Sequence, residues 1–123
     1  MISVSSKILV ASEQKRLVLL WQRNHDSYAL NRLIQSNIKA VTKGAFKMKS
    51  RNPSISTEDL IQEGLEGLVK AANKFDLDKD VTFLTYGLWW VRANMKRYIM
   101  DTLIMHTGSD LHDVVWSGSP EKI

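Results

Sequence analysis

The sequence predicts an all-α protein, a compact bundle of about four helices followed by a loosely structured C-terminal tail. Only two prolines, Pro53 and Pro120, interrupt the 123 residues, and apolar residues recur at the three-to-four-residue spacing of a helix face. A hydrophobic fraction of 44% and a charged fraction of 24% are usual for a globular domain with one core. We therefore expect one helical domain over residues 1–106, with a tail or the start of a linker over residues 107–123.

The first half of the chain is expected to hold two helices. Ser12 is suited to cap the first helix, which ends near residue 24, and Asp26 to cap a longer second helix that continues to about Met48. Both side chains carry an oxygen that accepts a hydrogen bond from an unpaired N–H group of the first turn. The stretch 49–56 then forms the main loop, because it is polar and contains proline.

The third helix has the most clearly marked start in the sequence. Ser56, followed three residues later by Asp59, resembles a capping box. Gly64 and Gly67 are expected to let another helix approach closely. An apolar stripe and a polar face lie on different sides of this helix. The stripe consists of Ile61, Leu65, Leu68, Ala72 and Phe75, and the polar face of Asp59, Gln62, Glu63, Glu66 and Lys70.

A fourth helix, over about residues 83–105, combines aromatic rings with cations. On a helical wheel, one arc holds Leu84, Leu88, Val91, Met95 and Tyr98, and the opposite arc holds Tyr86, Trp89, Trp90, Ala93, Lys96 and Arg97. Exposed rings among cations suit single-stranded nucleic acid, because bases stack on the rings and cations meet the phosphates. The alternative is that another helix covers these rings as a second core layer. Spacing alone favours neither, and the cations favour the first.

Charge is distributed unevenly along the chain. Residues 1–57 contain ten Lys and Arg against Glu13 and Asp26, whereas residues 58–80 contain seven Asp and Glu against three Lys. Two partners of opposite charge, one of them a polyanion, fit this pattern; solvated helix faces of mixed sign are the alternative. Cysteine is absent, which fits a reducing cytoplasm, and no signal peptide or membrane-spanning stretch is recognised. We expect a cytoplasmic protein without membrane contact.

Neither a metal site, a cofactor nor a catalytic centre is expected. Asp76, Asp78, Asp80 and Thr82 have the first four ligand spacings of an EF-hand, but Val81 and Gly87 replace its glycine and its bidentate glutamate. His106, Asp110, His112 and Asp113 lie in a weakly patterned stretch that predicts no fixed ligand geometry. No cysteine nucleophile, phosphate-binding glycine loop or isolated carboxylate pair is present. The chain is therefore not expected to be an enzyme.

Two segments together carry a family resemblance. DLIQEGLEGLVKAANKFD, at residues 59–76, and TFLTYGLWWVR, at residues 82–92, resemble regions of the bacterial sigma-70 family of RNA polymerase initiation factors. LIQSNIKAV, at residues 33–41, fits as well. The similarity extends over about residues 8–106 and corresponds to regions 1.2 and 2, nearest to the heat-shock-type members. It implies a transcription initiation domain that binds core RNA polymerase and recognises the melted −10 promoter element.

The resemblance implies a polymerase-binding face on the third helix. In the family, the DLIQEG helix docks on the clamp helices of the β′ subunit. The matching positions here are Glu58, Asp59, Gln62, Glu63, Leu65, Glu66 and Val69. Members usually carry Asn where Leu65 stands, so this contact is expected to be apolar or absent.

The resemblance also implies contacts with promoter DNA, chiefly with the single-stranded non-template strand. Phe75, Asp76, Lys79, Thr85 and Tyr86 match the pocket for a flipped adenine, Phe83 is expected beside them, and Trp89 and Trp90 match the pair at the upstream edge of the bubble. Asn37 and Lys39 match positions near a second flipped base. Ala93 and Lys96 stand where Gln and Thr usually read duplex base pairs, with Arg97 on the same arc, so a different promoter sequence is expected.

Regions 3 and 4 of the family have no counterpart in the sequence. The chain is therefore expected to be either an excised domain or a short protein, and a second protein supplying region 4, or an anti-sigma factor, is among the expected partners. The stretch TLIMHTGSDLHD, at residues 102–113, also lacks the basic residues usual after the aromatic helix. The alternative function is a sigma-like interaction protein that binds RNA polymerase as a co-regulator or decoy without reading promoter DNA.

Overall fold

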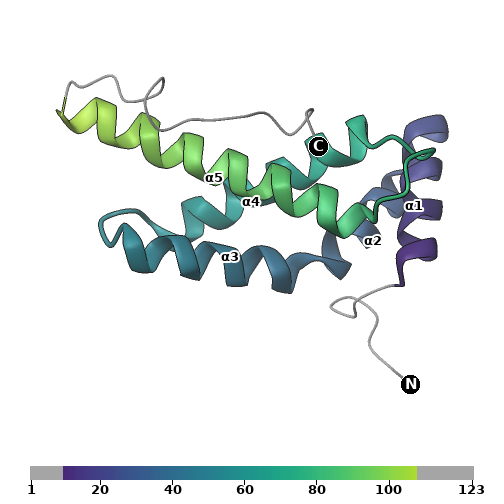
Figure 1. Ribbon diagram of the computed structural model, residues 1–123, viewed down its shortest axis with the longest axis horizontal. Coiled ribbons are helices and arrows are strands. Elements are labelled where there is room, and N and C mark those ends of the chain that lie inside the picture. Colours follow the sequence, from purple (N-terminus) through teal and green to yellow (C-terminus); the bar gives the residue numbers. More distant parts are fainter. Residues whose placement is uncertain (1–9, 108–123) are drawn as a thin grey trace.

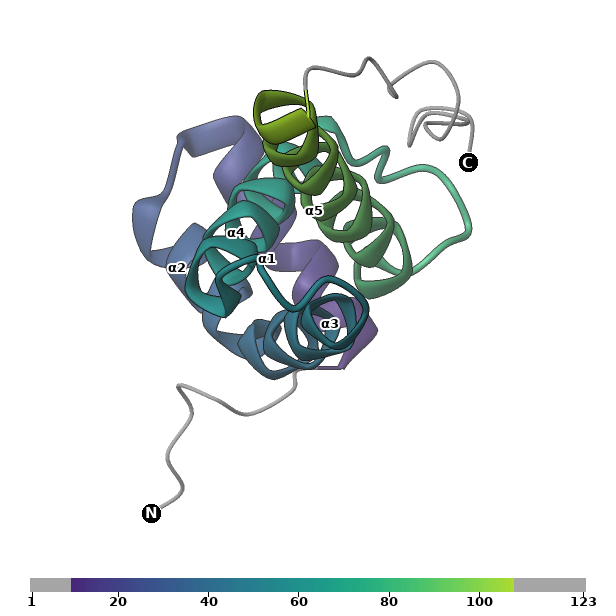
Figure 2. The same ribbon diagram turned by 90° about the vertical axis from the view of Figure 1, so that its left-hand side faces the viewer.

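The computed structural model describes residues 10–107, and within this range the chain forms five helices and no strand. They are α1 (Ala11–Asn24), α2 (Ser27–Ser36), α3 (Ile38–Arg51), α4 (Thr57–Lys74) and α5 (Phe83–Thr107). In Figure 1, α3, α4 and α5 run along the long axis and α1 stands across one end. Figure 2 views the bundle end on, with these three long helices at the corners of a triangle. The predicted all-α class is confirmed; the expected tail lies, apart from Thr107, outside the described residues.

The predicted helix starts are confirmed at two of three caps. The Asp26 carboxylate accepts a hydrogen bond from the Ala29 N–H at 3.2 Å, and the Ser56 hydroxyl oxygen accepts one from the Asp59 N–H at 3.3 Å. The predicted Ser12 cap is wrong, because the cap position lies two residues earlier, at Val10, and has no side-chain cap. None of the helices within residues 10–107 is both long and apolar enough to cross a membrane.

The single helix predicted over residues 27–48 is instead two helices that meet at Asn37. The Asn37 side-chain amide donates to the Leu33 carbonyl at 2.8 Å and to Gln14 Oε1 at 3.2 Å. Its backbone N–H donates to the Ile34 carbonyl at 3.0 Å, whereas an uninterrupted α-helix would pair it with the Leu33 carbonyl. A side chain that competes for the helical acceptor breaks the ladder. The bundle therefore has one helix more than predicted.

The main interface of the bundle joins α4 to α5. A Cβ added to Gly67 would lie 2.8 Å from the Trp90 carbonyl oxygen and 3.0 Å from Val91 Cα, so the two backbones approach closely, as predicted. The buried stripe of α4 is rotated from the prediction, because α3 and α5 pack on either side of Gly64: it consists of Leu60, Gly64, Gly67, Leu68, Ala71 and Ala72. Ile61 and Leu65 are only half-buried.

α1 closes the carboxyl end of α4. The Gln22 side-chain amide donates to the Ala72 carbonyl at 2.8 Å and to the Phe75 carbonyl at 3.0 Å, and the Trp21 indole N–H donates to Asn73 Oδ1 at 2.8 Å. The last carbonyls of a helix have no partner inside the helix, so these bonds satisfy acceptors at that end. They also fix the backbone of Phe75.

Candidate functional site

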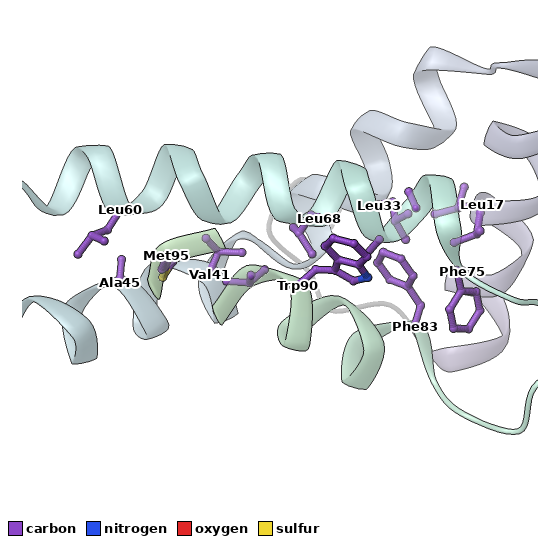
Figure 3. Packing of buried hydrophobic residues seen from close by; sticks show 14 of the residues in the cluster. Leu17, Leu33, Val41, Ala45, Leu60, Leu68, Phe75, Phe83, Trp90 and Met95 are labelled. Atoms are coloured by element: carbon purple, nitrogen blue, oxygen red, sulfur yellow. The ribbon is translucent and has the colours of Figure 1, made fainter. Parts of the chain in front are cut away.

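The predicted division of α5 into an aliphatic core arc and an exposed aromatic arc is wrong for part of the helix. Phe83 is 0% exposed and Trp90 is 9% exposed, and Figure 3 shows the Trp90 indole beside Phe83 between α4 and α5. α4 covers the side of α5 that carries Phe83 and Trp90. On another side of α5, Val91 lies near Val41 of α3. α5 is therefore buried on two flanks. For Phe83 and Trp90, the alternative that another helix covers the rings as a second core layer is therefore the correct one.

Four rings from two segments, the carboxyl end of α4 and α5, form an aromatic cluster, defined here as Phe75, Phe83, Tyr86 and Trp90. The Phe75 ring centroid lies 5.6 Å from that of Phe83 and 5.5 Å from that of Tyr86. The Tyr86 and Trp90 centroids are 6.4 Å apart in an edge-to-face arrangement. Phe75 is buried with Phe83, whereas Tyr86 and the adjacent Trp89 are half-buried. The cluster thus has buried rings beneath and accessible rings at its edge.

Two lysines beside these rings were not singled out from the sequence. Lys15 Nζ, on α1, lies 6.0 Å from the centroid of the Phe75 ring and donates to the Lys79 carbonyl at 3.3 Å. Lys74 Nζ, at the end of α4, lies 5.9 Å from the centroid of the Trp90 ring. Both separations suit a cation–π interaction. The excess of basic residues in the first half of the chain indicated basic surfaces, but not which lysines reach the rings.

The connection between α4 and α5 holds the predicted polar pocket residues in a compact turn. Asp76 Oδ1 accepts from the Asp78 N–H at 3.0 Å, and the Asp76 carbonyl accepts from the Lys79 N–H at 3.2 Å. Thr82 Oγ1 accepts from the Thr85 N–H at 3.2 Å and donates to Thr85 Oγ1 at 2.9 Å, which caps the start of α5. Asp76, Lys79 and Thr85 are all exposed.

Acidic residues and histidines do not form a metal site in the described part of the chain. No group of three or more side chains of the metal-binding types is arranged to hold an ion there. The EF-hand spacing falls instead on the turn between α4 and α5. Asp110, His112 and Asp113 lie outside the described residues, and so does the side chain of His106.

Besides the rings Phe75, Phe83 and Trp90, two more of the predicted DNA-binding residues, Asn37 and Ala93, are buried, whereas the cations near them in the sequence are exposed. Asn37 is 2% exposed and its amide is bonded to Gln14 and Leu33, so contact with a base would require its side chain to leave these partners. Ala93 is 8% exposed. Lys39, at the start of α3, and Lys96 and Arg97, on α5, are exposed. Asn37 and Lys39 lie at the α2–α3 junction, whereas the aromatic cluster is built from α5 and the carboxyl end of α4.

The polar face predicted on α4 is accessible along its length. Glu58, Asp59, Gln62 and Glu66 are exposed, and Glu63, Leu65 and Val69 are half-buried. Partial burial raises the pKa of Glu63, and the nearby Glu66 carboxylate raises it further. A row of carboxylates with an apolar margin is suited to a basic partner surface.

Side chains of α5 tie this face to the aromatic helix. The Tyr98 hydroxyl donates to Asp59 Oδ2 at 2.8 Å, and this hydrogen bond raises the pKa of Tyr98. The Asn94 amide donates to the Glu63 carbonyl at 3.1 Å and accepts from Lys70 Nζ at 3.3 Å. The carboxylate row and the rings are therefore carried by one helix pair.

The chain is similar to known RNA polymerase sigma factors. Residues 33–102 match the family model described as Sigma-70 region 2. RNA polymerase sigma factor SigA of Microcystis aeruginosa is 43% identical over 77 residues, which are 63% of this chain and 18% of that protein. RNA polymerase sigma factor RpoH of Zymomonas mobilis is 33% identical over 93 residues, 76% of this chain and 30% of that protein. For RNA polymerase sigma-B factor of Myxococcus xanthus the match is 41% identical over 68 residues, 55% of this chain and 27% of that protein. The chain thus spans less than a third of each of these relatives.

Proposed function

The chain belongs to the sigma-70 region 2 family, and from this we propose that it is a transcription initiation domain that binds core RNA polymerase and recognises promoter DNA. In the finer form of the proposal, it stabilises the melted −10 element by holding bases of the non-template strand. The observation that carries this form is the aromatic cluster, in which Tyr86 is accessible and two lysines lie beside Phe75 and Trp90, with the half-buried Trp89 one helical turn after Tyr86. The domain acts through binding free energy, and the polymerase carries out the chemistry.

Stacking on the accessible rings supplies the binding free energy. A base that stacks on an aromatic side chain gains about 1–3 kcal/mol, a gain available only to a strand whose bases are unpaired. Phosphates of that strand meet Lys79, which is exposed, and Lys15, whose Nζ lies 6.0 Å from the Phe75 ring centroid and donates to the Lys79 carbonyl. The buried rings Phe75 and Phe83 support Tyr86 from below and are proposed to position it instead of contacting bases themselves.

Trp90 is proposed to join Trp89 at the upstream edge of the bubble by a change of its side-chain conformation. Its indole N–H is buried without a hydrogen-bond partner among the described residues. An unpaired buried donor costs about 1–3 kcal/mol, part of which is recovered when the group reaches an acceptor or solvent. This cost offsets some of the burial free energy lost when the ring moves outward, and the nearby Lys74 supplies a cation for the adjoining phosphate.

Polymerase binding is proposed for the carboxylate row of α4. The residues are Glu58, Asp59, Gln62, Glu63, Leu65, Glu66 and Val69, and the partner is the pair of clamp helices of the β′ subunit. Exposure of most of these side chains supports the proposal. Leu65 and Val69 form the half-buried apolar margin of the row, so their contact with the partner is expected to be apolar.

Run-off transcription with core polymerase tests the proposal. The full chain is added to core polymerase on a promoter with a pre-opened −10 bubble, and bubble affinity is measured in parallel. Trp89→Ala is expected to weaken bubble binding by about 1–3 kcal/mol without changing core affinity. Tyr28→Ala is the matched control, because Tyr28 is a 71% exposed ring on α2, away from the cluster. Unchanged bubble affinity in Trp89→Ala contradicts base stacking on this ring.

The polymerase contact is tested separately by charge reversal. Glu66→Lys is expected to reduce core affinity measured without DNA, whereas Asp78→Lys makes the same charge change outside α4 and is expected to leave it intact. Equal core affinity for Glu66→Lys and the wild type contradicts the proposed face. Core binding by the wild type with no transcript from bubble or duplex template supports the co-regulator or decoy alternative.

A further inference from the structure

A basic groove lies between α3 and α5. Its volume is about 520 Å³, and five cations line it: Lys43, Lys47 and Arg51 from α3, and Arg92 and Lys96 from α5. Its floor is apolar and includes Met48, Leu88 and Val91, and no carboxylate residue lines it. Of the five cations, only Lys96 was assigned a role by the sequence.

The cations of the groove are available to a ligand. All five are exposed, and none forms an ion pair with a carboxylate within residues 10–107. Lys43, Lys47 and Arg51 recur every fourth residue, so they line one side of α3 about 6 Å apart along its axis. Like charges held together repel one another, and a polyanion relieves this repulsion. A regular row of cations suits the regularly spaced phosphates of a nucleic acid strand.

The groove shares a residue with the set assigned to DNA. Arg92 and Lys96 follow Trp89 by three and seven residues, which places them on the same side of α5, one and two turns further along. Lys96 therefore belongs both to the lining of the groove and to the residues assigned to DNA. Opening a duplex produces two single strands, and the aromatic edge accommodates only one of them.

We propose that the basic groove binds the second strand of the opened promoter, with its phosphates on the five cations and its unpaired bases toward the apolar floor. This inference rests on the proposed function. A closed duplex keeps its bases stacked inside and makes no use of the floor. An acidic protein segment would also use both the cations and the apolar floor. The position of Arg92 and Lys96 on the side of α5 that carries Trp89 favours DNA.

The test compares two DNA probes bound by the full chain with core polymerase. One is a promoter bubble with both strands present, and the other is the same template with the opened part of the second strand removed. Lys43→Gln/Lys47→Gln is expected to reduce the slope of log affinity against log salt by about 1.4 on the complete bubble, since each lost single-strand phosphate contact lowers it by about 0.7. On the gapped template the slope is expected to be unchanged. Arg23→Gln removes an exposed cation of α1 as the control and should alter neither slope.

Each other outcome overturns the inference in a distinguishable way. Equal losses on both templates assign the lysines to the first strand, and the same loss on a closed duplex assigns them to the duplex backbone. No loss on any template leaves the groove to a different ligand, such as an acidic protein segment. If the wild type with core polymerase does not bind the bubble at all, the proposed function itself fails and the inference fails with it.

Discussion

Replacing Gly67 with alanine tests the close approach of α4 and α5. The added Cβ would lie 2.8 Å from the Trp90 carbonyl oxygen, 3.0 Å from its carbonyl carbon and 3.0 Å from Val91 Cα. All three atoms are backbone, so no side-chain rotation relieves the clash and the helices must separate. Overpacking of this kind costs about 1–3 kcal/mol, and a contact with rigid backbone belongs in the upper part of that range. The higher helix propensity of alanine returns about 0.8–1.0 kcal/mol.

The net expectation for Gly67→Ala is a loss of about 1–2 kcal/mol in the free energy of unfolding, the difference between these two terms. For a domain of this size, that lowers Tm by about 5–15 °C. Calorimetry or thermal circular dichroism measures the shift.

Two other glycines calibrate the Gly67→Ala experiment. Gly44 on α3 has nothing within 4 Å of an added Cβ, so Gly44→Ala gains helix propensity alone and should raise Tm by about 4–8 °C. At Gly64, the added Cβ would meet Met95 Cε and Val41 Cγ1, both at 2.7 Å. These are side-chain ends, so Gly64→Ala should be destabilised less than Gly67→Ala. A Gly67→Ala variant that gains stability as Gly44→Ala does would refute the close backbone contact.

Two further predictions concern polar side chains of the core and of the carboxylate row. Asn37→Ala removes the hydrogen bonds to Leu33 and Gln14 and is expected to lower the free energy of unfolding by about 1–3 kcal/mol. Urea denaturation measures this change. An unchanged urea midpoint would show that these hydrogen bonds do not contribute to stability. Glu63→Gln is expected to stabilise the domain at pH 7 by no more than about 0.5 kcal/mol, because a raised pKa in the folded state means that ionised Glu63 opposes folding. That penalty is absent below the ordinary pKa of 4.5 and complete above the raised pKa of the folded state. The urea midpoints of Glu63→Gln and the wild type should therefore converge at acid pH. A difference between them that stays constant from pH 4 to pH 7 would contradict ionisation of Glu63 as its cause.

Local signals in the sequence were sufficient for the parts of the fold that depend on neighbours along the chain. Asp26 and Ser56 cap helices as predicted because the acceptor and its donor lie within one turn. Gly67 marked a close contact because a missing side chain on an otherwise regular helix face leaves room for a partner. The polar face of α4 was also predictable, since solvent exposure follows helical periodicity when one side packs.

The errors arose where tertiary contacts override local pattern. Asn37 breaks a helix because its amide reaches Gln14 on α1, a partner that helical periodicity does not reveal. Trp90 and Phe83 are buried because α5 has neighbours on two flanks, whereas a helical wheel drawn for one helix assumes one buried side. Lys15 joins the site through the packing of α1 against the start of the α4–α5 connection. Each of these requires knowledge of which helices are adjacent.

The contact at Gly67 also restricts how the proposed site can open. Because the Trp90 backbone lies against α4 at this glycine, and Asn94 bonds to the Glu63 carbonyl one turn further on, α5 cannot move away from α4 without losing both contacts. Exposure of the Trp90 ring is therefore expected through rotation of its side chain about a fixed backbone. The carboxylate row proposed for polymerase then keeps a constant position relative to Tyr86 and Trp89, so polymerase docking would set the location of the base-stacking rings directly.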